Sequence, residues 1–154
     1  MSPRRTRVQR IISIREKQRD EKVKTLADRE RSLAEANHKA EGEKRRLFHA
    51  TAERERLANE GADAKSWLEA DEWLAARAAL HDIAKRQAER ASVAVDHARD
   101  AVVEAQVDVR RVEMLSERLE AKERADEERV ARRLEDEIAA QRFEQVLERW
   151  KPSR

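Results

Sequence analysis

The sequence contains almost nothing that interrupts a helix. Its 154 residues include two prolines, Pro3 and Pro152, and two glycines, Gly42 and Gly61. Proline removes a backbone donor and kinks a helix, and glycine is the next weakest helix former. Between the two prolines, therefore, the only breaks that we expect lie at glycine.

The composition favours long helices over a globular core. Charged residues make up 44 % of the chain, aromatic residues make up 3 %, and the mean hydropathy is -1.01. Such a chain cannot fill a compact interior at the usual packing density. Ala, Leu, Glu, Lys and Arg are strong helix formers, so their abundance predicts an all-α coiled coil rather than disorder.

One segment reads as a turn between two helices. Gly61 can end a helix in the left-handed conformation, and Asp63 or Ser66 can cap the next one. We therefore predict a single elongated domain, residues 1–154, that forms a long antiparallel two-helix coiled-coil hairpin. Its helices span about 4–58 and about 66–150, with an apex near residues 59–66. A short separate helix after the apex, around residues 67–80, is the alternative.

Heptad seams predict how the two helices pair. The second helix has a seam in alternating steps of four and three, formed by Ala84, Ala88, Ala91, Val95, Ala98, Val102, Ala105, Val109, Val112, Ser116 and Leu119. The first helix has one line spaced by seven, Ile12, Arg19, Leu26, Leu33, Ala40 and Leu47. Its expected companion line is poor, with Val23, Glu30, Asn37, Lys44 and Thr51.

An antiparallel fold about the apex brings these seams together. Ala40 then faces Ala84, Ile12 faces Val112, and Arg4 reaches the level of Glu120. The segment 121–150 would extend beyond the pair, so its apolar residues would lack a partner in the chain. These residues are Val130, Leu134, Ile138, Phe143, Leu147 and Trp150.

No residue pattern indicates catalysis, a cofactor or a metal. The chain has no Cys, no glycine-rich phosphate loop, and four histidines of which none are paired at i, i+4. It also has no apolar run long enough to span a membrane and no secretory signal. Residues 1–25 carry nine Lys or Arg against three Asp or Glu, but without an aromatic residue for stacking. We therefore expect no nucleic-acid partner and an acidic protein surface as the contact of this basic start.

Three of the five aromatic residues lie near the predicted apex. Phe48 precedes it, and Trp67 and Trp73 follow it, with Leu80 nearby. These residues are either a small apolar plug or an exposed docking patch, since Trp is enriched in interface hot spots.

The segments "RVQRIISIREKQRDEKVK" and "RRLEDEIAAQRF", together with the Trp-bearing middle, resemble the YscO/FliJ family of type III secretion proteins. The resemblance runs through nearly the whole chain and is closer to the injectisome branch, YscO-like, than to the flagellar branch. It implies a non-enzymatic stalk, a monomeric hairpin that couples the hexameric secretion ATPase to the cytoplasmic domain of the export gate and assists chaperone handling. It also implies a place in the bacterial cytoplasm, at the inner-membrane export apparatus, reached only through partners.

The resemblance also implies two contact regions. The ATPase contact would involve Arg4, Arg5, Arg7, Arg10, Arg15, Leu134, Ile138 and Trp150. The gate contact would involve Phe48, Trp67, Trp73 and Leu80, although the chain has no Tyr where the flagellar pattern has an aromatic surface. A generic coiled-coil adaptor, or a basic helical protein that binds nucleic acid, are the alternative functions.

Overall fold

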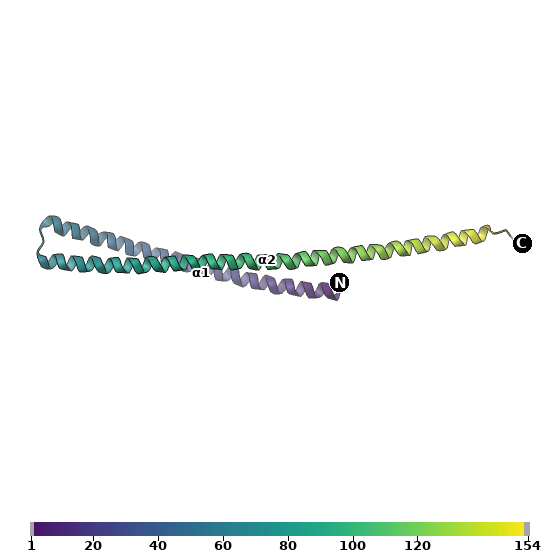
Figure 1. Cartoon of the computed structure of the whole chain (residues 1–154), viewed down its shortest axis with the longest axis horizontal. Coiled ribbons are helices and arrows are strands. Elements are labelled where there is room, and N and C mark those ends of the chain that lie inside the picture. Colours follow the sequence, from purple (N-terminus) through teal and green to yellow (C-terminus); the bar gives the residue numbers. More distant parts are fainter. Residues whose placement is uncertain (1, 153–154) are drawn as a thin grey trace. The chain divides into compact units, whose positions relative to one another are not determined.

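The computed structural model describes residues 2–152, which form two long helices and no strand. Helix α1 spans Pro3–Glu60 and helix α2 spans Ala64–Trp150, and Figure 1 shows the short connection between them. The all-α hairpin predicted from the sequence is confirmed. Helix α2 is continuous through residues 67–80, so the alternative with a separate short helix after the apex is wrong.

The apex forms where its turn residues predict it. Gly61 has a φ of 72°, and the Ala62 N–H donates to the Leu57 carbonyl oxygen at 3.1 Å, which is the bond of a Schellman cap. Of the two cap candidates, Asp63 is the one that acts, because its Oδ1 accepts from the Ser66 N–H at 3.2 Å. Hydrogen bonds from Ser66 also lower the pKa of Asp63.

The two glycines give a matched pair of predictions with opposite signs. A Cβ added at Gly42 meets no atom within 4 Å, and the position is helical. Gly42→Ala should therefore raise the free energy of unfolding by about 0.5–1 kcal/mol. Gly61→Ala should lower it by about 1–2 kcal/mol, because a Cβ strains the left-handed conformation. Chemical denaturation followed by circular dichroism measures both, and equal signs would contradict this account of the apex.

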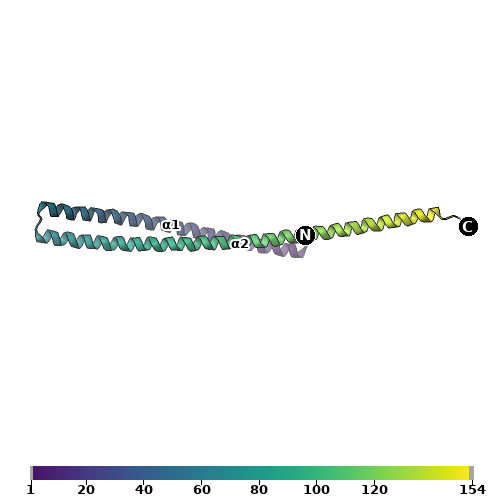
Figure 2. The same cartoon turned by 45° about the horizontal axis from the view of Figure 1, so that its top comes forward.

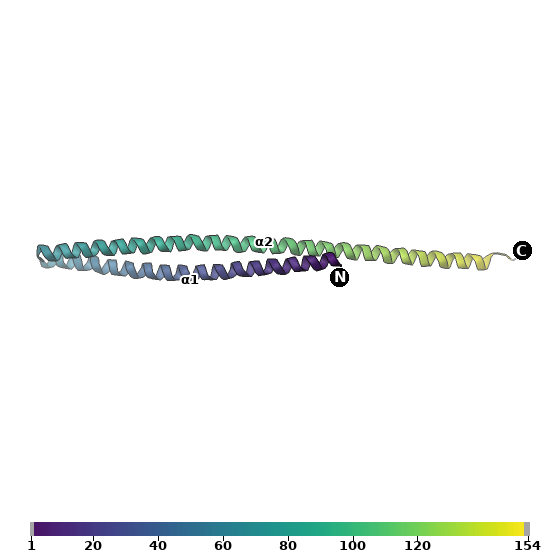
Figure 3. The same cartoon turned by 90° about the horizontal axis from the view of Figure 1, so that it is seen from below.

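Contacts between the helices divide into two units, and the first comprises residues 16–107. Within it, α1 and α2 run antiparallel and side by side, as Figures 2 and 3 show. Ala84, Val95 and Ala98 of α2 are buried. The predicted line of α1 faces them with half-buried side chains, Arg19, Leu26, Leu33, Ala40 and Leu47. Small residues of α2 therefore receive larger residues of α1, as close packing requires.

The companion line predicted for α1 is wrong. Val23, Glu30, Asn37, Lys44 and Thr51 are all exposed. The second line lies on the other side of the leucines, and its members are Ala36, Glu43, Ala50 and Leu57. Two alanines on that side allow the helices to approach closely, and the one carboxylate that it buries, Glu43, has Arg46 and Arg77 beside it. The rejected line would bury more polar side chains, which is costly.

The second unit combines the residues up to Arg15 with those from Asp108 onward. Val8 and Val109 are buried there, and Gln9 Nε2 donates to Ser116 Oγ at 3.4 Å. Arg5 Nη2 lies 2.7 Å from Glu120 Oε1, one residue from the predicted register. Ser2 Oγ also donates to Glu123.

Beyond these contacts, every residue of α2 from 124 to 150 is exposed. The unpartnered segment predicted at the end of the second helix is therefore confirmed within this unit.

Candidate functional site

The two predicted contact regions fall into different units. All eight residues of the expected ATPase contact lie in the unit formed by the residues up to Arg15 and those from Asp108 onward. All four residues of the expected gate contact lie in the unit 16–107. Each region is therefore a surface of one unit.

The arginines of the first region differ in how exposed they are. Arg4, Arg7 and Arg10 are exposed, whereas Arg5 is half-buried and paired with Glu120. The Nε of Arg5 is buried and has no hydrogen-bond partner among the described residues. Arg15 is exposed but engaged in an interaction of its own. Arg4, Arg7 and Arg10 therefore supply the basic charge, while Arg5 holds the pairing of the helices.

The apolar residues of 124–150 form two patches rather than one continuous stripe. Val130, Leu134 and Ile138 are each about half exposed and follow one another by four residues. Phe143, Leu147 and Trp150 are 65 %, 50 % and 82 % exposed. At about 100° per residue, Phe143 lies about half a turn of the helix away from Leu134. A partner must therefore either wrap around α2 or contact one patch at a time.

The aromatic residues of the second region are partly held by arginines. Trp67 is half-buried, and the guanidinium of Arg54 lies 5.5 Å from its ring centroid. Arg54 also pairs with Asp71, with Nε and Oδ1 2.6 Å apart. Trp73 is 52 % exposed, and the guanidinium of Arg77 lies 4.3 Å from its ring centroid. Trp67 therefore packs as part of the apex, and Trp73 presents an open ring face.

Phe48 does not join Trp73 and Leu80 in one patch. Phe48 is 71 % exposed and follows Lys44 by one turn, on the side of α1 that borders a groove between the helices. Leu80 directly precedes His81, which lines the same groove, so it points about 100° away from it around α2. Trp73 shares the face of Leu80, seven residues earlier. The four gate candidates therefore belong to at least two surfaces.

A buried carboxylate beside these residues is missing from the sequence prediction. Glu43 is 7 % exposed, and Arg46 Nη1 donates to its Oε1 at 2.7 Å. Among the described residues, its Oε2 accepts no hydrogen bond, and it lies 3.7 Å from Arg77 Nη1. The predicted register gave a signal for this layer. If Ala40 faces Ala84, then Arg77 lies opposite Leu47, one turn from Glu43.

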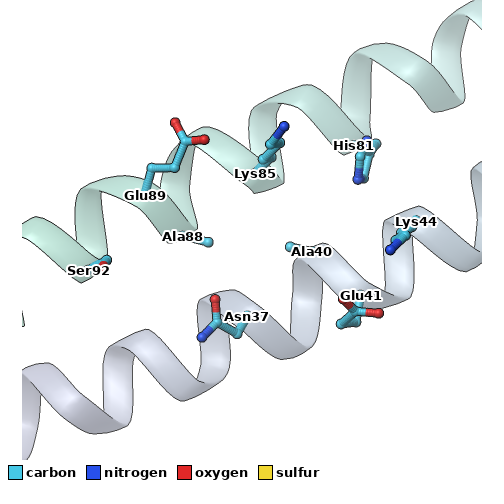
Figure 4. Close-up of a pocket in the computed structure, with 9 residues that line it drawn as sticks. All are labelled: Asn37, Ala40, Glu41, Lys44, His81, Lys85, Ala88, Glu89 and Ser92. Atoms are coloured by element: carbon cyan, nitrogen blue, oxygen red, sulfur yellow. The ribbon is translucent and has the colours of Figure 1, made fainter.

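The groove itself is open and of mixed charge (Figure 4). Its volume is about 490 Å³, and small residues, Ala40 and Ala88, lie on its two sides. Lys44, Lys85 and Glu41 surround it. Within residues 2–152, no group of three or more His, Cys, Asp or Glu side chains could hold a metal ion. Alternating charges in an open groove do not desolvate a carboxylate enough to make it an acid or base catalyst.

Among the described residues, neither helix has a stretch apolar enough to cross a bilayer. Comparison with protein-family models, with curated proteins and with solved structures finds no match to this chain.

Proposed function

We propose that the chain is a non-enzymatic stalk component of a bacterial type III secretion export apparatus. In this role it links the hexameric secretion ATPase to the cytoplasmic domain of the export gate, and it assists the handling of secretion chaperones. The proposal takes its family assignment from the motifs of residues 7–24 and 132–143, with the injectisome branch favoured.

The observation that carries the proposal is the exposed helix 124–150. Its large apolar side chains are all about half exposed or more in the structure of residues 2–152. These are Val130, Leu134, Ile138, Phe143, Val146, Leu147 and Trp150. Exposed apolar patches of this kind mark contacts with other proteins. The same unit carries the basic residues Arg4, Arg7 and Arg10, so one unit offers both charge and apolar area to a partner.

The mechanism that follows is mechanical rather than chemical. Two paired helices with few breaks form a stiff element, since each helix satisfies its own backbone hydrogen bonds. The ATPase ring would hold the unit that carries the exposed helix, and the gate would contact the unit that carries Trp73 and Leu80. The chain would then transmit the movement of one partner to the other.

A paired-variant experiment tests the ATPase contact. Leu134→Asp with Ile138→Asp places two charges in the first apolar patch, and neither side chain supports the hairpin. We expect this variant to lose at least about tenfold in affinity for the secretion ATPase of the same organism, measured by co-elution and by titration. Its helicity and melting temperature should equal those of the wild type.

The control is Val103→Asp, because Val103 is 57 % exposed but lies in the other unit. This variant should bind the ATPase like the wild type. If the wild type, the double variant and Val103→Asp all bind the ATPase equally well, helix 124–150 does not contact the ATPase. If another protein binds the chain, and this binding is lost when Leu134 and Ile138 are changed, the adaptor function is favoured instead.

A further inference from the structure

Helix α2 carries a second heptad line, which runs beside its buried seam and is exposed. Trp73, Ala76, Leu80 and Ile83 follow in steps of three, four and three, and all four are exposed. The line is distinct from the buried seam, which passes through the neighbouring Ala84. Three residues of this line are 52 %, 45 % and 52 % exposed, namely Trp73, Leu80 and Ile83. This spacing is typical of a helix face that pairs with another helix.

The charges around this line are arranged with opposite signs at its two ends. Glu69 and Glu72 lie at its beginning, and Arg86 and Arg90 lie at its end. All four side chains are exposed. Within residues 2–152, none of the four takes part in an ion pair, whereas many other arginines of the chain do. Unpaired charge of both signs on one face is available to a partner of reversed polarity.

We propose that this face binds a second copy of the chain, with the two α2 helices antiparallel and a two-fold axis near Leu80. The axis brings Leu80 against Leu80, and Ala76 against Ile83 of the second copy. It places Glu72 opposite Arg86 and Glu69 opposite Arg90, and the symmetry makes each of these pairs twice. We name this surface, residues 69–90 of α2, the dimer face.

Two further features fit this pairing. Ala79 lies next to the axis and is exposed, so its small side chain allows the two helices to approach closely. A shallow hollow of about 320 Å³ lies at the basic end, lined by Arg86, Arg90, Glu89 and Val93. In the antiparallel arrangement this hollow receives the acidic end of the second copy.

A parallel arrangement is disfavoured by the same charges. It would place Glu69 against Glu69 and Arg90 against Arg90 at the two ends of the line, and like charges across a helix pair repel. Antiparallel pairing instead places Glu69 opposite Arg90 at both ends of the line, and these opposite charges attract. The contact is short, about one and a half heptads of apolar residues, so it belongs with small and reversible interfaces.

The proposal does not rest on the stalk function, and it replaces the expectation of a strictly monomeric free chain. If both hold, the second copy covers Trp73 and Leu80 and must leave before these residues contact an export gate.

Charge reversal with sedimentation equilibrium tests the pairing. The wild-type mass should rise from 18.0 kDa toward twice that value as concentration increases into the hundreds of micromolar. Glu72→Arg and Arg86→Glu should each weaken dimerisation at least about tenfold, because each places like charges opposite one another. The double variant should restore it. A wild-type mass that stays at 18.0 kDa overturns the proposal, as does a Glu72→Arg variant that dimerises like the wild type.

Cysteine cross-linking tests the orientation, and the chain has no Cys of its own to interfere. Ala79→Cys should form a disulfide-linked dimer, because its copy lies across the axis. Ala76→Cys should not, since it faces Ile83. Lys85→Cys is the control, because Lys85 is exposed and lies about 120° around α2 from Ala79. Cross-linking of Ala76→Cys as fast as Ala79→Cys would mean a parallel pair, and equal cross-linking of Lys85→Cys would mean random collision; either result overturns the proposal.

Discussion

Val95→Asp should separate the two helices. Val95 is 2 % exposed and is the most deeply buried large side chain of the seam. An aspartate there would place an unpaired charge between the helices, which costs about 3–5 kcal/mol. Because small proteins are stable by only about 5–15 kcal/mol in total, we expect a large drop in melting temperature, measured by circular dichroism.

The matched control lies two residues away. Val93 is 54 % exposed, so Val93→Asp makes the same chemical change on the outer side of the same helix. Its free energy of unfolding should stay within about 0.5 kcal/mol of the wild type. Equal melting temperatures for the two variants would contradict the seam. If only Val93→Asp lowers the melting temperature, the side of α2 that packs against α1 is the one that carries Val93.

Arg77→Leu should also destabilise the hairpin strongly. The change removes the guanidinium that stacks on Trp73 and approaches the buried carboxylate of Glu43. Arg46 still binds Oε1 of Glu43, but the buried Oε2 loses the guanidinium that lies 3.7 Å away. We expect the free energy of unfolding to fall by about 2–4 kcal/mol, measured by urea denaturation.

The double variant separates the charge from the packing. Glu43→Leu with Arg77→Leu removes both charges and fills the layer with apolar side chains. Buried ion pairs are often replaced in this way without loss of stability, so the double variant should be at least as stable as the wild type. A double variant as unstable as Arg77→Leu would mean that the stack on Trp73, not the unpaired carboxylate, dominates.

The hairpin could be predicted from the sequence because its determinants are local. Gly61 and Asp63 fix the apex through backbone conformation and a side-chain cap, which depend on neighbouring residues only. The seam of α2 is also a local pattern, since its residues repeat along one helix. The antiparallel register follows from these two features, and the pair Arg5–Glu120 lies within one residue of it.

The parts that the sequence did not predict depend on contacts across the pair. Glutamate is usually a surface residue, so nothing in the sequence around Glu43 predicts its burial. The guanidinium of Arg77, on the other helix, lies close enough to offset part of the cost of burying the carboxylate. The companion line of α1 was predicted on the wrong side because alanine is only a weak apolar signal. Ala36 and Ala50 are recognisable as part of the interface only once the other helix packs against them. The gate candidates were grouped by their distance from the apex, whereas their direction around each helix separates Phe48 from Leu80.

The central claim, a stalk that acts on a secretion ATPase, is tested most directly by the ATP hydrolysis rate of that enzyme from the same organism. The rate is measured with and without this chain, and the oligomeric state of the ATPase is followed by size-exclusion chromatography. We predict a higher rate together with co-elution of the chain with the hexameric ring. An unchanged rate with no co-elution would contradict the stalk function and leave a coiled-coil adaptor as the better account.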